Sequence, residues 1–380
     1  MNNDQNTLFQ PIPTPSDPAP TPPTAPAAPT VPNVATAEVE TDPTTLENVV
    51  FFKVNQRMFA KGEITFPCLP NAIDRFIKQI EGLFTTLQKP FSEGEIANLR
   101  QVMLARMEQA FQSSPHSFVT FRYEPAQPPQ QGFVCQINVA STSVAQQYTN
   151  WVSARQPPLF GKYPDAKVMA IVEQLGTPET NPVIDIGAGT GRNTVPIAQL
   201  GYPVDAVELT PAFAQQIRDL ATEKGLPISV TEGNILDPLV RLRPSHYQLA
   251  IVSEVISHLR GVDQLRLLFA KMCDFLRPGG VLLCNTFMTV DGYELPPVFR
   301  EWGEVSFSSI YTRADLATAM ERLPLQLLAE EPVYDYEKAN QPADGWPPTS
   351  WYESWSTGRD VFPVQKQPPM NLQWLLLRRI

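Results

Sequence analysis

The segment Pro182–Thr194, PVIDIGAGTGRNT, constrains the fold of this chain more than any other part of its sequence. A short apolar run ends in Asp185 and is followed by Gly187, Gly189 and Gly191, after which a helical pattern begins. Glycines at such a place allow a tight turn and a close approach of the backbone to a ligand, and the start of the next helix presents unpaired N–H groups. The segment predicts a strand, a turn and a helix, with a nucleotide-type cofactor above the turn.

Strand and helix patterns alternate from about residue 145 to residue 380. This alternation is typical of an α/β fold with a mostly parallel, Rossmann-like sheet and helices on both faces. We expect helices to begin near Asn193, Pro211, Leu236 and Asp263, and no helix between the last two strands, which can then form an antiparallel pair. The seven expected strands are PVIDIG, PVDAVEL, ISVTEGN, YQLAIVSE, GGVLLCNTF, LQLLAEEPVYDY and NLQWLLLRR.

The sequence before residue 145 divides into two parts. Residues 1–45 are rich in Pro, Thr and Ala and contain no Lys or Arg, so we expect a disordered tail that serves as a tether or as a ligand for a partner protein. Residues 46–144 predict a small α+β accessory domain that contacts a partner or positions a substrate. Its expected elements are the strands NVVFFKV, SFVTFRY and GFVCQINVA, helices around residues 71–87 and 92–111, and a core stripe of Ile73, Phe76, Ile77, Ile80 and Phe84.

The motif order points to a family of cofactor-binding domains. A dinucleotide fingerprint requires GxGxxG, and Arg192 at its sixth position disfavours a nicotinamide or flavin cofactor. The segment DIGAGTG instead resembles the first motif of the class I S-adenosylmethionine-dependent methyltransferases. Glu208 at the end of the second strand, Asn234 after the third and the turn LRPGGVL before the fifth follow in the family's order. The resemblance spans about residues 182–286.

The resemblance implies how S-adenosylmethionine is held. Asp185 would contact the methionine amino group directly or through water, or else would only hold the glycine loop. Glu208 would accept hydrogen bonds from both ribose hydroxyls. Asn234 stands in place of the commoner Asp, and its amide oxygen would accept a hydrogen bond from the adenine amino group. The expected cofactor-binding residues are Asp185, Gly187, Gly189, Gly191, Glu208, Asn234, Ile235, Ser253 and Glu254.

His258 is the expected catalytic residue. Methyl transfer from a sulfonium is an in-line displacement that needs alignment more than catalytic groups, and a base only if the acceptor atom arrives protonated. His258 lies just past the fourth strand, at the edge where open α/β sheets bind ligands, so it is a candidate base; the alternative is a packing histidine. Glu254 at the same edge would hold a substrate or cofactor group, or would merely be solvated.

Two segments are expected to enclose the methyl acceptor. Residues 147–164 would form a lid, and the loop 338–369 would emerge at the same edge. Aromatic rings in this loop would either form walls for a flat or cationic acceptor or pack the loop onto the domain. The ring residues are Trp346, Trp351, Tyr352 and Trp355, and further candidate lining residues are Asp291, Tyr293 and Glu294.

Composition restricts the substrate and the location. The formal net charge of −10 and the isoelectric point near 5.0 argue against nucleic acid as a partner. No apolar stretch is long enough for a membrane span, no signal peptide is evident, and no cysteine spacing predicts a metal site, so we expect a cytoplasmic enzyme. The predicted function is S-adenosylmethionine-dependent methylation of a small molecule. The alternatives are a protein or RNA methyltransferase and a non-catalytic S-adenosylmethionine-binding adaptor.

Overall fold

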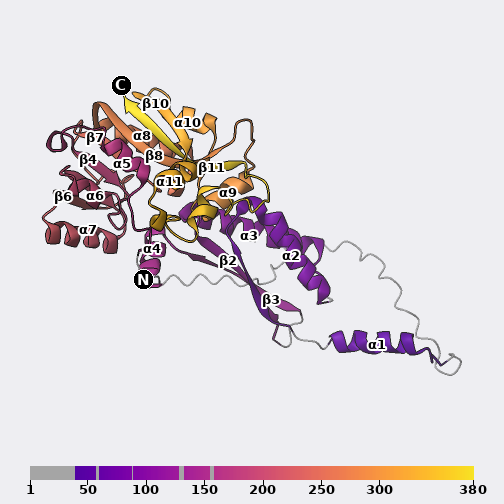
Figure 1. The fold of residues 1–380 in the computed structure, drawn as a ribbon. Coiled ribbons are helices and arrows are strands. Elements are labelled where there is room, and N and C mark those ends of the chain that lie inside the picture. The colour runs from indigo at the N-terminus through magenta and orange to yellow at the C-terminus, as the bar shows by residue number, and fades with distance from the viewer. Residues whose placement is uncertain (1–38, 57–59, 88, 128–131, 155–157) are drawn as a thin grey trace, which may run out of the picture. The chain divides into compact units, whose positions relative to one another are not determined.

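The computed structural model describes residues 39–56, 60–87, 89–127, 132–154 and 158–380 (Figure 1). The chain forms two compact units. Of the described residues, the first unit contains those up to 67, those of 73–109 and those of 118–140, and the second contains those of 68–72, 110–117 and 141–380. Residues 1–38 of the expected tail lie outside the described residues. The division of the chain at residue 144 stays a prediction.

The first unit contains a three-stranded sheet and an amphipathic helix with a buried apolar stripe. The strands follow the order β1 (Gly62–Pro67), β2 (Ser117–Pro125) and β3 (Phe133–Ser141), and β1 is antiparallel to β2. The helices are α2 (Ile73–Thr86) and α3 (Glu93–Ser113). The expected stripe on α2 is confirmed, because Ile73, Ile77, Ile80 and Phe84 are buried, while Phe76 is half-buried.

The first expected strand of the accessory domain, NVVFFKV, is wrong. These residues lie in helix α1 (Pro43–Gln56), which also removes residues 43–45 from the expected disordered tail. The Asp42 carboxylate accepts a hydrogen bond from the Thr45 N–H at 2.7 Å, and Pro43 takes the first helical position. A capped start of this kind outweighs the strand propensity of β-branched and aromatic residues that have no neighbouring strand to pair with.

The second unit contains the predicted α/β sheet. Its strand order is β10-β11-β8-β7-β4-β5-β6, with the short β9 paired to β8. The strands from β6 to β8 are parallel, and β11 is antiparallel to both β8 and β10, as expected for the last pair. The bounds are β4 (Val183–Ile186), β5 (Val204–Glu208), β6 (Ile228–Glu232), β7 (Tyr247–Val252), β8 (Leu276–Thr289), β9 (Ile310–Tyr311), β10 (Leu325–Pro332) and β11 (Met370–Arg379). Only β9, two residues long, was not predicted.

Helices cover both faces of this sheet (Figure 1). Alternate residues of β4 face opposite ways: Ile184 and Ile186 pack in a cluster with α8 and α10, whereas Val183 packs with α5, α6 and α11. The helices are α4 (Val144–Ala154), α5 (Ala166–Val172), α6 (Thr194–Gln199), α7 (Pro211–Lys224), α8 (Gly261–Phe275), α9 (Pro297–Val305), α10 (Arg313–Met320), α11 (Val333–Asn340) and α12 (Tyr352–Ser356). Such burial of both faces explains the near-continuous apolar strands.

Two details of the second unit differ from the sequence prediction. No helix begins at Leu236; the segment between β6 and β7 forms turns, which agrees with the prolines Pro238 and Pro244. The expected strand LQLLAEEPVYDY ends at Pro332, and VYDY begins α11, so a helix does lie between the last two strands. Proline has no N–H for the sheet, and the four-residue spacing of buried Val333 and Glu337 suits a helix.

The sheet topology determines where a ligand can bind. β4 pairs with β5 on one side and with β7 on the other, so the direction of strand succession reverses at β4. Ligands of open α/β sheets bind at the carboxyl ends of the strands beside such a reversal. Among the described residues, no helix is long and apolar enough to cross a membrane.

Candidate active site

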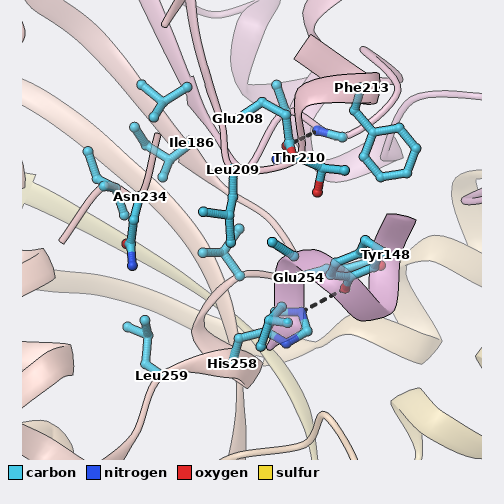
Figure 2. A pocket seen from close by; sticks show the side chains of 18 of the residues that line it. Tyr148, Ile186, Glu208, Leu209, Thr210, Phe213, Asn234, Glu254, His258 and Leu259 are labelled. Atoms are coloured by element: carbon cyan, nitrogen blue, oxygen red, sulfur yellow. Dashed lines mark hydrogen bonds between the residues drawn. The ribbon is translucent and has the colours of Figure 1, made fainter. Parts of the chain in front are cut away.

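A cavity of about 470 Å³ lies at the carboxyl ends of β4, β5, β6 and β7 (Figure 2). Its volume falls in the range of small-molecule sites, about 300–1,000 Å³. Every residue predicted to bind the cofactor lines it except Gly191, and His258 lines it as well. The strand ends thus bring together residues that lie far apart in the sequence.

Glycines shape the floor of this cavity for two different reasons. Gly187 has a φ of +69°, and a Cβ there would lie 2.3 Å from Cγ2 of Val255, so a side chain at this position would clash as well as strain the turn. Gly191 has a φ of +84° and lies where a Cβ would press on Val195 and Ile217, away from the cavity. Gly187 therefore allows Val255 to approach the loop at the cavity, and Gly191 allows the following helical segment to pack closely.

Glu208 connects the end of β5 to the glycine loop. Its carboxylate accepts hydrogen bonds from the N–H of Gly189 at 2.8 Å and from the N–H of Thr210 at 2.7 Å. Burial raises the pKa of Glu208, and these backbone donors oppose the shift. Each carboxylate oxygen keeps capacity for a further donor. In Figure 2 the side chain lies at the wall of the cavity next to Thr210 and Leu209.

Asp185 is buried beneath the same loop. The hydroxyl of Thr194 donates a hydrogen bond to its carboxylate at 2.6 Å, so Asp185 also anchors the start of α6. Burial raises the pKa of Asp185 to about 7, and the hydrogen bond from Thr194 opposes this shift. The two roles considered for Asp185, loop anchor and ligand contact, are therefore compatible in this geometry.

Asn234 and Ile235 follow β6 at the opposite wall. The Asn234 side chain is exposed, and its amide oxygen accepts a hydrogen bond from the N–H of Leu236 at 2.9 Å. This local bond fixes the turn and leaves a second lone pair on the oxygen. Ile235 is 5% exposed and packs with the core cluster under the cavity.

A buried polar network that the sequence analysis missed supports the site. Asp165 is 2% exposed, and its carboxylate accepts hydrogen bonds from Arg192, from Asn193 at 2.9 Å and from Ser253 at 2.8 Å. Arg192 also pairs with Glu254 at 3.2 Å. The mismatch of Arg192 with the dinucleotide fingerprint was visible in the sequence, but the segment that supplies Asp165 showed no pattern that predicted its partner.

Glu254 is held in place by its backbone and by its side chain. Its φ is +60°, which is uncommon for a residue with a side chain, and its N–H donates to the Asn285 side chain at 2.7 Å. Burial raises the pKa of the Glu254 carboxyl, while the charge of Arg192 opposes the shift. Strained backbone of this kind concentrates at functional sites.

His258 forms a pair with Tyr148 of α4 (Figure 2). The distance between Nε2 of His258 and the Tyr148 hydroxyl is 2.9 Å, and Nδ1 is buried without a hydrogen-bond partner. Burial lowers the pKa of His258 to about 4, so the ring is neutral near pH 7 and binds a proton weakly. The prediction that His258 is a catalytic base is not tested by these contacts.

A second cavity of about 160 Å³ adjoins the first. Both cavities are lined by Tyr148, Phe160, Glu254 and His258. The remaining walls of the second cavity are Ser257, Ser306, Phe307, Trp351, Trp355 and Asp360. Because the two cavities share these lining residues, they lie next to each other.

The two segments expected to enclose an acceptor both contribute to this second cavity. Residues 147–164 supply Tyr148 and Phe160, whereas residues 155–157 and the Trp151 side chain lie outside the described parts. The aromatic loop supplies Trp351 and Trp355 as walls, while Trp346 contacts the rings of Tyr334 and Tyr352 and so packs the loop onto the unit. The loop therefore lines a cavity and also packs onto the unit, while its contact with an acceptor stays a prediction. Three candidates line neither cavity: Asp291, Tyr293 and Glu294.

Comparison with protein families identifies the domain. Residues 183–280 match a family described as a methyltransferase domain. The second unit therefore contains a class I S-adenosylmethionine-dependent methyltransferase domain, which confirms the family resemblance of the motifs; the cofactor of this family is S-adenosylmethionine. In the part of the chain that the structure describes, no three His, Cys, Asp or Glu side chains are grouped to hold a metal ion.

Two similar proteins are ubiquinone biosynthesis O-methyltransferases. The one from Maricaulis maris is 27% identical over 121 residues, which cover 32% of this chain and 46% of the relative. The one from Methylobacterium nodulans is 25% identical over 158 residues, 40% of this chain and 61% of the relative. The match thus spans less than two thirds of either relative. A solved geranyl diphosphate C-methyltransferase from Streptomyces coelicolor has a TM-score of 0.43 and 19% identity, over 57% of this chain and 79% of that chain.

Proposed function

We propose that this chain is an enzyme that transfers the methyl group of S-adenosylmethionine to a nucleophilic atom of a small molecule. The observation that carries the proposal is the pair of adjoining cavities. The larger is lined by the motifs of the methyltransferase family, and the smaller is separated from it only by shared walls that include Glu254 and His258.

We assign the cofactor contacts from the family motifs and from the residues that line the larger cavity. The glycine loop, with Gly187 and Gly189, contacts the methionine part of S-adenosylmethionine. The Asp185 carboxylate binds the ammonium group of that part. The Glu208 carboxylate accepts hydrogen bonds from the ribose hydroxyls, and the Asn234 amide oxygen accepts one from the adenine amino group. Ile235 packs against the adenine ring, Ser253 and Glu254 border the sulfonium side, and Gly191 acts through helix packing.

The reaction asks little of the protein beyond alignment. The sulfonium is already a good leaving group, so holding the acceptor atom, the methyl carbon and the sulfur in line supplies much of the rate enhancement. The pair formed by Tyr148 and His258 lies on the wall that both cavities share, where it can orient the acceptor. We assign His258 a positioning role, because its lowered pKa makes it a weak base.

The second cavity also separates the proposal from its alternatives. A non-catalytic adaptor has no need of a space beside the sulfonium, and a cavity of about 160 Å³ suits a small group better than a folded macromolecule. A protein or RNA substrate, bound by the first unit, would have to insert a single side chain or base into the second cavity. The cytoplasmic location and a protein partner for the tail or for the accessory unit stay predictions.

A transfer assay tests the proposed function. The purified chain is incubated with methyl-labelled S-adenosylmethionine and an extract separated into small molecules, RNA and protein. We expect label to enter the small-molecule fraction, and Glu208→Gln to abolish the transfer at low cofactor concentration. Label that enters RNA or protein would favour the alternative substrates. Tight cofactor binding without transfer to any fraction would favour the adaptor.

Cofactor binding should depend on pH through Asp185. The ionised carboxylate binds the ammonium group, and the pKa of Asp185 in the free protein is about 7. Affinity for S-adenosylmethionine should therefore fall as the pH drops below 7, by up to about tenfold per pH unit, since protonated Asp185 must first lose its proton. Calorimetric titrations between about pH 5 and pH 7 measure this slope.

The variant Asp185→Asn serves as the control for this dependence. It should bind the cofactor weakly, and its affinity should change less steeply with pH, because the carboxyl group of Asp185 is gone. Some pH dependence should remain, because Glu208 and Glu254 are the other predicted cofactor contacts with a titrating carboxyl group. An unchanged slope in Asp185→Asn would show that another group causes the dependence and would remove the assigned contact.

A further inference from the structure

Tyr, Phe and Trp side chains make up half of the residues that line the second cavity. Its five rings come from three segments of the second unit: Tyr148 and Phe160, then Phe307, then Trp351 and Trp355. Tyr148 and Phe160 meet edge to face with centroids 6.0 Å apart, and Trp351 meets Trp355 in the same way at 5.6 Å. Ring faces attract cations, and ring faces and edges both pack against flat groups.

The polar part of this wall is acidic. Glu254 and Asp360 line the cavity, and among its described lining residues there is no Lys or Arg. His258 adds no positive charge near pH 7, because burial lowers its pKa to about 4. Arg192 pairs with Glu254 and lines only the cofactor cavity; Arg192 also contacts Asp165. The second cavity therefore presents carboxylates and aromatic rings to its occupant. This combination disfavours the binding of an anion.

The size of the cavity limits its occupant to about one ring. Its volume is about 160 Å³. A cavity of about 150 Å³ in another protein holds a benzene molecule. A larger acceptor would have to place one ring, or a group of similar size, in this space and extend outside it.

We propose that the second cavity binds a small organic amine in its ammonium form, carried on a group about the size of one ring, and that Glu254 takes the proton from this amine before methyl transfer. This inference rests on the proposed methyltransferase function and specifies its acceptor. The rings hold the ammonium group through cation–π attraction, and Asp360 adds a second carboxylate near the opening.

The proposed step balances in atoms and charge. The ammonium nitrogen gives one proton to the Glu254 carboxylate, which leaves a lone pair on the nitrogen. This lone pair forms a bond to the methyl carbon, the bond between carbon and sulfur breaks, and its electron pair stays on the sulfur. The products are a methylated ammonium ion and neutral S-adenosylhomocysteine, and the proton on Glu254 leaves to solvent.

Glu254 is suited to this role by its position. It lines both cavities. Its backbone has a φ of +60°, and its N–H donates a hydrogen bond to the Asn285 side chain, which holds this conformation. Burial raises its pKa, which makes it a stronger base than an exposed carboxylate. Arg192 keeps its contact with Asp165 when Glu254 becomes protonated, so the buried guanidinium retains a partner.

Three probes of one shape and different charge test the proposal. The full chain, loaded with S-adenosylhomocysteine, is titrated with benzylamine, benzyl alcohol and benzoate. We expect benzylamine to bind at least about tenfold more tightly than benzyl alcohol, and benzoate to bind more weakly than both. When S-adenosylmethionine replaces S-adenosylhomocysteine in the mixture with benzylamine, mass spectrometry should detect N-methylbenzylamine.

Charge-removing variants identify the groups responsible. Glu254→Gln should reduce the preference for benzylamine and slow its methylation by more than it weakens its binding, because the base is lost together with the charge. Asp360→Asn should reduce only the preference. Asp219→Asn, an exposed carboxylate of α7 outside both cavities, should change neither.

The possible results separate this inference from the function on which it rests. Failure to bind S-adenosylhomocysteine would contradict the methyltransferase function and the inference with it. Normal binding of S-adenosylhomocysteine with equal or tighter binding of benzyl alcohol or benzoate, or with no binding of benzylamine, would overturn the inference alone. A Glu254→Gln variant that methylates benzylamine at the wild-type rate would remove the assigned base.

Discussion

Glu208→Gln is expected to weaken the binding of S-adenosylmethionine by about 100-fold. The carboxylate of Glu208 already accepts the N–H groups of Gly189 and Thr210, and the ribose hydroxyls would use its remaining lone pairs. Glutamine keeps the shape but replaces one oxygen by an NH₂ group. The NH₂ group would place a hydrogen-bond donor opposite a backbone N–H, and it could not accept a hydrogen bond from the ribose hydroxyls. Isothermal titration calorimetry measures the loss directly.

Glu232→Gln is a matched control for this prediction. Glu232 ends β6 and pairs in register with Glu208 at the end of β5, yet its side chain is 43% exposed and lines neither cavity. Its substitution should leave the dissociation constant unchanged within about twofold. Equal affinities of the Glu208→Gln protein and the wild type would mean that the ribose is not held by β5.

Asp165→Asn should lower the free energy of unfolding of the second unit by about 3 kcal/mol. Asp165 is the common acceptor for Arg192, Asn193 and Ser253, and the Arg192 side chain is 9% exposed. Without the Asp165 charge, the buried Arg192 guanidinium keeps only the longer pair with Glu254 at 3.2 Å, and breaking one partner of a buried network costs far more than the pair contributes. Denaturant unfolding followed by tryptophan fluorescence reports on this unit, because all six tryptophans occur after residue 150.

An exposed ion pair provides the comparison. Asp344 contacts Lys162 at 3.0 Å with both side chains 63% exposed, so Asp344→Asn should change the unfolding free energy by less than about 1 kcal/mol. The Asp165→Asn protein should also bind S-adenosylmethionine more weakly, since Arg192, Ser253 and Glu254 line the cofactor cavity. Similar small effects of both substitutions would show that the buried network does not stabilise the site.

The cofactor half of the site was predictable because its signals are local. The glycine loop is a contiguous segment, and Glu208 and Asn234 each follow a recognisable strand, so their meeting at one sheet edge follows from the topology of parallel strands. The last two strands are antiparallel as predicted, although α11 and α12 lie between them where no helix was expected. The sequence could not distinguish the ligand role of Gly191 from its packing role, since both require glycine.

The supporting network and the second cavity were less predictable because their contacts join distant segments. Asp165 reaches Ser253 across 88 positions, and Tyr148 reaches His258 across 110 positions. A lone Asp or Tyr carries no periodic signal that names such a partner. Local signals also competed in α1 and α11, where a capped start or a proline outweighed strand propensity.

The most direct test of the central claim is a calorimetric titration of the full-length chain with S-adenosylmethionine and, separately, with NADH. We expect saturable binding of S-adenosylmethionine and no binding of NADH, because Arg192 occupies the place where a dinucleotide fingerprint requires glycine or alanine. Binding of NADH alone, or of neither ligand, would contradict the assignment of the cavity at β4 to a sulfonium cofactor.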